Sequence, residues 1–185
     1  MPAFGFPSRV LGIIPARRDS KRLPGKNMME FRGKPLSEWA MDHGSKHITQ
    51  TVVTSNDDKV IALAIRKGID AVLRPEEMCH DDSPVMEAVN HVLARYRADW
   101  VVLLQPTSPL RNVFDIDGCI EEAWRTRKPV VSTCGGKLNG AVYVATPAQL
   151  YKNGSFSIDA VHYEMPAERS VDIDTLEDFL LAVTA

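Results

Sequence analysis

Short apolar runs alternate with amphipathic segments along most of this chain, and this alternation constrains the fold more than any other feature. The apolar runs are rich in Val, Ile and Leu, as buried strands are. The runs that we predict as strands are 9–15, 51–55, 69–73, 100–104, 129–133 and 141–145. The segments between them repeat apolar residues at helical spacing. The helices that we predict are 35–46, 57–67, 83–96, 115–127 and 175–183.

Strands that are separated by helices in this order are typical of an α/β fold. We therefore predict a doubly wound, mostly parallel sheet with helices on both faces, in which ligands bind at the carboxyl ends of the strands. The chain has 185 residues and shows no internal repeat, low-complexity tract or interdomain linker. A single domain over 1–185 is the expectation.

Composition excludes several classes of function. The formal net charge of −2 gives no general attraction to nucleic acid or to anionic lipid, so neither partner is expected. No apolar stretch approaches the roughly 18 residues that a membrane-spanning helix needs, and residues 1–10 lack the pattern of a secretion signal. The three cysteines form no CxxC pair and the five histidines no HExxH motif, so no zinc site is indicated. We expect a cytoplasmic protein.

One loop carries a strong local charge in this slightly acidic chain. Residues 16–27 read ARRDSKRLPGKN, with a net charge of +4. The cations of this loop are Arg17, Arg18, Lys21, Arg22 and Lys26. Together with the Ser20 hydroxyl and backbone N–H groups, they can bind the phosphate oxygens of a triphosphate at the end of the first strand. From charge alone, a solvated loop that only aids solubility is an equal alternative. The kinase, GTPase and dinucleotide alternatives lose support because GxxxxGK[ST] and GxGxxG are absent.

Two late aspartates form a second candidate site. Asp172 and Asp174 are two residues apart in SVDIDT, so an extended backbone directs both carboxylates to one side. Such a pair can bind a hard cation such as Mg²⁺, which completes its shell with waters and substrate phosphates. The alternative is that one aspartate caps the helix expected near Thr175, which leaves the other available for a metal.

Several segments also resemble the motifs of a known family. Residues 13–27, IIPARRDSKRLPGKN, followed by GKPL at 33–36, are similar to the amino-terminal signature of the sialic acid and Kdo cytidylyltransferases. Three further parts are similar to the acylneuraminate branch and occur in the same order: VLRPEE at 72–77, LLQPTSPLR at 103–111, and NGAVY at 139–143 with SVDIDT at 170–175. These segments span nearly the whole chain, and QPTSPLR favours the acylneuraminate branch over the Kdo branch.

This resemblance implies a Rossmann-like nucleotidyltransferase fold and transfer of CMP from CTP to the anomeric hydroxyl of an acidic 2-keto sugar, a sialic-acid-like nonulosonic acid. The nucleotide-binding residues that it implies are Ala16, Arg17, Ser20, Lys21, Lys26, Asn27 and Arg74. Among these, Arg17, Lys21 and Lys26 would stabilise the transition state. The implied sugar contacts are Gln105, Asn139 and Tyr143, and Mg²⁺ would be the cofactor at Asp172 and Asp174.

The chain departs from this family pattern in two places. Family members usually carry several tens of residues between the predicted strands at 129–133 and 141–145, where this chain has only CGGKLN at 134–139. The missing segment would contribute sugar contacts and much of a dimer interface, so the acceptor and a possible homodimer stay open. Two alternatives follow, a Kdo-type enzyme and a CTP-binding protein without turnover. The second departure is Ser20-Lys21-Arg22, where SKG is commoner.

Overall fold

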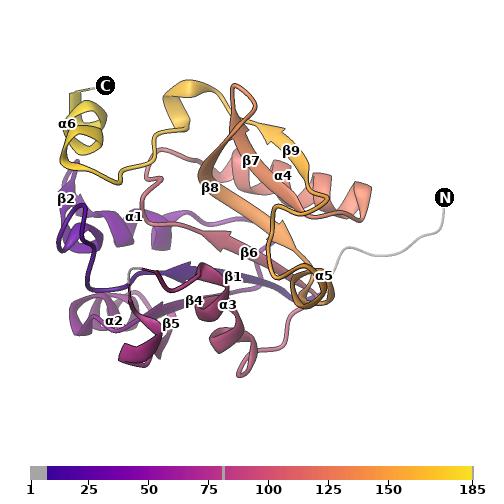
Figure 1. The fold of residues 1–185 in the computed structure, drawn as a ribbon, viewed down its shortest axis with the longest axis horizontal. Coiled ribbons are helices and arrows are strands. Elements are labelled where there is room, and N and C mark those ends of the chain that lie inside the picture. The colour runs from indigo at the N-terminus through magenta and orange to yellow at the C-terminus, as the bar shows by residue number, and fades with distance from the viewer. Residues whose placement is uncertain (1–7, 81, 185) are drawn as a thin grey trace.

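The structure is a computed structural model that describes residues 8–80 and 82–184. Within these residues a seven-stranded sheet has the order β5-β4-β1-β6-β8-β7-β9 (Figure 1). Its strands are β1 (Val10–Pro15), β4 (Gln50–Ser55), β5 (Asp70–Leu73), β6 (Trp100–Leu104), β7 (Val130–Cys134), β8 (Lys137–Ala145) and β9 (Val161–Glu164). A small separate sheet pairs β2 (Glu30–Phe31) with β3 (Lys34–Pro35).

The direction of the strands confirms the predicted sheet. β1 pairs in parallel with β4 and β6, β4 pairs in parallel with β5, and β7 pairs in parallel with β9. β8 is antiparallel to both of its neighbours, β6 and β7. The carboxyl ends of β1 and β6 therefore lie side by side at the same edge of the sheet, which is the edge where an α/β fold binds its ligands.

Helices cover both faces of the sheet, as the sequence predicted. The helices are α1 (Leu36–Asp42), α2 (Asp58–Arg66), α3 (Val85–Leu93), α4 (Val113–Thr126), α5 (Pro147–Asn153) and α6 (Leu176–Thr184). Side chains of β1 alternate between two buried clusters, with Val10 and Ile14 in one and Leu11 and Ile13 in the other. The first cluster includes residues of α1, α2 and α4, and the second includes residues of α3 and α5.

A third apolar cluster holds α6 against the β2–β3 hairpin. Phe31 of β2 and Ala182 of α6 are buried in it together with Ile173, which lies between the two candidate metal ligands. The ring of Phe179 meets that of Phe31 edge-on at 6.2 Å between centroids. This packing fixes the path of the chain segment that leads into α6 (Figure 1).

Some elements differ from the sequence prediction. The first helix is shorter than expected and ends at Asp42, because Gly44 follows and residues 43–49 form a loop. Sequence reasoning missed α5, although Thr146 and Gln149 form a reciprocal capping box at its start and Gly154 in the left-handed conformation ends it. It also missed the two-residue strands β2 and β3 and the four-residue strand β9.

The terse connection at 134–139 proves to be a hairpin. Cys134 of β7 pairs with Lys137 of β8, and Gly135 and Gly136 between them have φ angles of 58° and 74°. A two-residue turn with two positive φ angles matches the twist of an antiparallel pair, and glycine tolerates this conformation. The strand predicted at 141–145 therefore begins earlier, at Lys137.

No helix among the described residues is both long and apolar enough to cross a bilayer. Residues 1–7, where the sequence shows no pattern of a secretion signal, lie outside the described part of the chain.

Candidate functional site

A cavity of about 240 Å³ opens at the carboxyl ends of β1 and β6. Four chain segments line it: the loop after β1, the loop after β5, the loop after β6, and the segment before α6. The predicted site residues that line this cavity are Arg17, Lys26, Asn27, Arg74, Gln105, Asp172 and Asp174. The structure therefore brings the basic loop and the two late aspartates to one place.

The contact between these two segments is direct. The Nζ atom of Lys26 lies 2.8 Å from Oδ1 of Asp174, although the two residues are 148 positions apart. The guanidinium Nη2 of Arg22 lies 2.8 Å from Oδ2 of the same carboxylate. Each oxygen of Asp174 is thus paired with a cation of the basic loop. The sequence analysis counted Arg22 among the cations of this loop but did not name it among the nucleotide-binding residues.

The two aspartates differ in the partners of their carboxylate oxygens. The Oδ1 atom of Asp172 is buried and has no hydrogen-bond partner. Burial raises the pKa of this carboxyl group, a hydrogen bond from the side chain of Thr107 lowers it, and the nearby charge of Asp174 raises it again. The backbone is tied to the same loop, because the Ile173 N–H donates to the Thr107 carbonyl at 2.8 Å. Thr107 belongs to the QPTSPLR motif, which is the signal that could have identified it.

A glycine makes room for this carboxylate. Gly140 has a φ angle of 73°, and a Cβ atom at this position would lie 3.0 Å from Oδ2 of Asp172 and 3.6 Å from Nε2 of Gln105. Any larger residue would be strained at this positive φ and would crowd the Asp172 carboxylate. This is a physical reason for a glycine in NGAVY.

Neither aspartate caps the last helix. At the start of α6 the N–H of Thr175 donates to Oδ2 of Asp178 at 2.8 Å, and the N–H of Asp178 donates to Oγ1 of Thr175 at 3.2 Å. This reciprocal pair is a capping box. The capping alternative for Asp172 or Asp174 is therefore wrong, and both carboxylates face the cavity.

The arrangement fits a divalent cation. A buried carboxylate oxygen without a partner is costly, and a hard cation that prefers oxygen ligands would satisfy it. No group of three or more His, Cys, Asp or Glu side chains suited to a metal occurs among the described residues. A metal here would take two protein carboxylates and draw its other ligands from water and a bound phosphate.

Two further arginines, Arg74 and Arg17, also line the cavity together with Asn27. Arg74 is buried, its Nη2 donates to the Thr54 carbonyl at 3.1 Å, and its Nε has no partner. Burial lowers the pKa of Arg74. Asn27 is also buried, and its amide donates to the Arg17 carbonyl at 2.7 Å, which holds the basic loop against itself. The Arg17 guanidinium donates to the His80 carbonyl at 2.6 Å.

Five predicted site residues lie outside the lining of this cavity: Ala16, Ser20, Lys21, Asn139 and Tyr143. Ala16 and Ser20 are buried and Lys21 is exposed. The roles predicted for these three residues stay predictions. Ser83 lines the cavity although it was given no role from the sequence.

Asn139 makes internal hydrogen bonds, and its predicted sugar contact stays a prediction. Its Oδ1 accepts from the Ser132 hydroxyl at 2.6 Å and its Nδ2 donates to the Ser170 hydroxyl at 3.0 Å. This buried amide braces β7 and β8 against the segment that carries the aspartates. Tyr143 is half-buried and packs against Phe156 at 6.0 Å between ring centroids, and burial raises the pKa of its hydroxyl group.

Comparisons with known proteins agree with this geometry. Residues 11–165 match a family model described as Cytidylyltransferase. A CMP-N,N'-diacetyllegionaminic acid synthase of Legionella pneumophila is 32% identical, over 94% of this chain and 94% of the relative. An N-acylneuraminate cytidylyltransferase of Escherichia coli is 29% identical, over 96% of this chain but only 52% of that protein.

The alignment with the Legionella protein shows a difference in length. It runs over 224 positions, whereas 94% of this 185-residue chain is about 174 residues, so about 50 positions lie opposite gaps in this chain. The relative is thus longer by several tens of residues inside the aligned region.

Solved structures show the same fold. A CMP:2-keto-3-deoxy-manno-octonic acid synthetase complexed with CTP has a TM-score of 0.72 at 17% identity, over 96% of this chain and all of the other. A manganese complex of a Mycobacterium tuberculosis protein has a TM-score of 0.65 at 15% identity, over 96% of this chain and all of that one.

Proposed function

The chain belongs to the cytidylyltransferase family, and from that membership we propose that it transfers CMP from CTP to the anomeric hydroxyl of an acidic 2-keto sugar, with release of pyrophosphate. The observation that carries this proposal is the meeting of Lys26 and Arg22 with Asp174 in one cavity at the strand ends. A cavity lined by both cations and carboxylates suits a ligand that is itself a polyanion accompanied by a metal ion.

The reaction is an in-line displacement at phosphorus. The anomeric oxygen forms a bond to the α-phosphorus of CTP, the bond from that phosphorus to the bridging oxygen breaks, and the hydroxyl proton is released. Catalysis by this chain then consists mainly of positioning and of stabilising charge, and no covalent intermediate is required.

The residues of the basic loop would bind the triphosphate. We assign Arg17, Lys21 and Lys26 to stabilising charge on the phosphates, with Ser20 and the backbone at Ala16 completing the loop's contacts. Lys26 has the strongest geometric support, because it lies at the cavity and is already directed at Asp174.

The remaining wall would bind the cytidine and the sugar. Asn27 and Arg74 line the cavity and are assigned to the cytidine, and Gln105 at the end of β6 is assigned to the acceptor. Tyr143 follows on β8, where it would contact the sugar from the neighbouring strand. Asn139 would be a further sugar contact, and it also donates to Ser170 in the aspartate segment.

We propose Mg²⁺ as the ion at Asp172 and Asp174. The unpartnered Oδ1 of Asp172 supports this assignment, since a carboxylate oxygen is a ligand that Mg²⁺ prefers. When bound, the ion supplies positive charge that neutralises phosphate oxygens.

A nonulosonic acid is the proposed acceptor, because the Legionella and Escherichia coli relatives are named for legionaminic and acylneuraminic substrates. A Kdo-type acceptor is the second candidate, and the solved Kdo synthetase structure favours it through the fold alone. We further propose that the insert present in relatives is missing at the hairpin 134–139. We also propose that the protein acts in the cytoplasm as a homodimer. No nucleic acid or membrane partner is proposed.

A pyrophosphate-release screen tests the function. The four nucleoside triphosphates are each combined with sialic, legionaminic, pseudaminic and Kdo acceptors in the presence of Mg²⁺. The expected result is release that requires both CTP and a nonulosonic acid. Tight binding of CTP without release under every condition would replace the enzyme with a nucleotide-binding protein.

A further inference from the structure

Both oxygens of Asp174 pair with cations of the basic loop. Arg22 Nη2 and Lys26 Nζ each lie 2.8 Å from one of its two oxygens. The neighbouring carboxylate, Asp172, has one buried oxygen with no partner at all. A cation that binds between the two aspartates would therefore lie beside two positively charged side chains and be repelled by them.

The two competing cations differ in how firmly they are held. The Lys26 side chain is 14% exposed and begins the 3₁₀ turn η1 (Lys26–Met28), which Asn27 anchors to the loop. The Arg22 side chain is 64% exposed. An exposed ion pair contributes little free energy, because water and salt screen it, so Arg22 can leave Asp174 at low cost.

The phosphates of a bound nucleotide would offer Arg22 a second set of partners. Arg22 lines the same cavity as Lys26 and Arg17, which is where we place the triphosphate. A guanidinium makes paired hydrogen bonds to phosphate oxygens as readily as to a carboxylate. When a nucleotide enters, its phosphates would compete for Arg22 with the carboxylate.

We propose that Arg22 is an exchangeable counter-ion that holds Asp174 in the free protein and moves to the nucleotide phosphates when they bind, which frees Asp174 for the divalent cation. This inference rests on the proposed function, because it takes its ligands from it. Its consequence is that nucleotide and metal bind cooperatively, and that each raises the affinity for the other by the same factor.

The proposal makes two predictions of opposite sign for Arg22→Ala. Titration of the full chain with Mn²⁺ alone, without nucleotide, should show up to about fivefold tighter binding in the variant than in the wild type, because the counter-ion of Asp174 is gone. Titration with CTP in EDTA should show weaker binding in the same variant, because a phosphate contact is lost. General damage to the site would weaken both.

Arg18→Ala is the matched control. It removes one positive charge from the same loop, but Arg18 pairs with Glu76 at 3.1 Å and with Asp19 at 3.6 Å, and not with Asp174. Its Mn²⁺ affinity should stay within about twofold of the wild type, since two surface charges at longer range are screened by salt. The double variant Arg22→Ala with Asp174→Asn should lose this gain.

Three results would overturn the counter-ion proposal: equal Mn²⁺ affinity in the wild type and Arg22→Ala, an equal gain in Arg18→Ala, and no detectable Mn²⁺ binding by either the wild type or Arg22→Ala. The pyrophosphate-release screen decides the proposed function separately. An active enzyme whose Mn²⁺ affinity does not respond to Arg22 would retain the function and reject only the counter-ion. Circular dichroism and thermal melting confirm that the variants are folded.

Discussion

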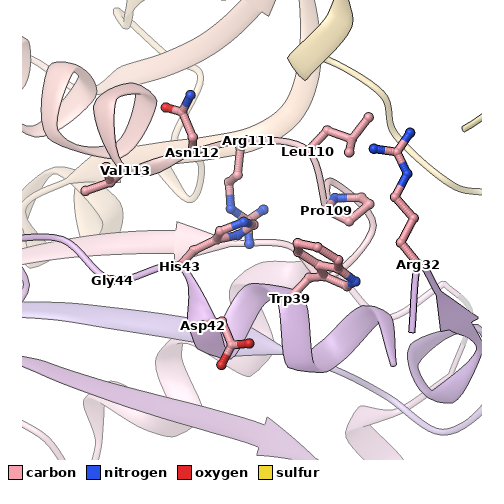
Figure 2. Close-up of a pocket in the computed structure, with 10 residues that line it drawn as sticks. All are labelled: Arg32, Trp39, Asp42, His43, Gly44, Pro109, Leu110, Arg111, Asn112 and Val113. Atoms are coloured by element: carbon pink, nitrogen blue, oxygen red, sulfur yellow. The ribbon is translucent and has the colours of Figure 1, made fainter. Parts of the chain in front are cut away.

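Arginine side chains line several cavities of this molecule, and two of these cavities show two different uses of arginine. In the cavity at the strand ends, Arg22 and Lys26 meet a carboxylate that comes from the far end of the sequence. A second cavity of about 360 Å³ lies between α1 and the segment 109–113. There Arg111 extends toward His43, with Trp39 beside them (Figure 2).

In the second cavity, the arginine makes hydrogen bonds to the backbone of neighbouring segments. Arg111 is only 1% exposed, and its Nη1 donates to the carbonyls of Gln105 at 2.6 Å and Ala141 at 3.1 Å. Burial lowers the pKa of Arg111 to about 9, although Asp115 and Asp172 oppose this. Burial and the charge of Arg111 lower the pKa of His43 to about 3, so this histidine is neutral at pH 7.

The difference shows which buried polar groups indicate function. Both regions contain polar atoms without partners, among them Oδ1 of Asp172 and Nη2 of Arg111. In the first region two cations pair directly with a carboxylate from the far end of the sequence, whereas Arg111 donates to backbone carbonyls. Arg111 instead ties the end of β6 to β8, and so it holds Gln105 in place from behind the site. Variants in the two regions should therefore affect different properties.

The largest effect is expected at the first cavity. Lys26→Ala or Asp174→Ala should each lower kcat by on the order of 10²-fold or more, which corresponds to about 3 kcal/mol of transition-state stabilisation. Steady-state pyrophosphate release measures kcat, and thermal melting should show little change. Near-normal turnover in both variants would contradict the assignment of this site.

A smaller effect, on stability, is expected at the second cavity. Arg111→Ala should lower the free energy of unfolding by about 2 kcal/mol, because two buried carbonyls lose their donor and a void is left. Removal of a buried charge that has no ion pair offsets part of this loss. Urea denaturation measures the change. A stability equal to that of the wild type would mean that the guanidinium does not brace β6 against β8.

The pH dependence of stability should sharpen the same comparison. The pKa of His43 is lower in the folded chain than in the unfolded chain, so the unfolded state binds the proton more readily as the pH falls. His43 therefore contributes stability that is present above about pH 6.5 and lost below it, by up to about 1.4 kcal/mol per pH unit. Urea unfolding at pH 7 and pH 5 measures this.

The control for the pH experiment is His43→Gln, which keeps a polar side chain but cannot titrate. Its unfolding free energy should fall less between pH 7 and pH 5 than that of the wild type. Equal slopes in the two proteins would place the titrating group elsewhere.

The smallest effect is expected at the cap of α6, next to the aspartates. Thr175→Ala removes the Oγ1 atom that accepts from the Asp178 N–H and should lower the free energy of unfolding by about 1 kcal/mol. Asp178 also accepts from the Asp174 N–H at 3.0 Å, and this bond does not involve Thr175, so kcat should stay within a few-fold of the wild type. A loss of kcat as large as that of Asp174→Ala would show that the cap and the catalytic site act as one unit.

Local patterns in the sequence determined much of this protein. The apolar runs indicated most strands of the central sheet, since a strand buried on both faces is mostly apolar. The charge of residues 16–27 and the two-residue spacing of Asp172 and Asp174 identified both halves of the candidate site. Such signals depend only on neighbours along the chain, which is why they could be read without coordinates.

Only the tertiary structure decided how these parts are used. Two features depend on which distant segments meet: the pairing of Lys26 with Asp174, and the hydrogen bond of Asn139 to Ser170. Sheet order and the packing of α6 on the β2–β3 hairpin set those meetings. No local pattern specifies contacts between segments that lie more than a hundred residues apart, because each is formed by the fold as a whole.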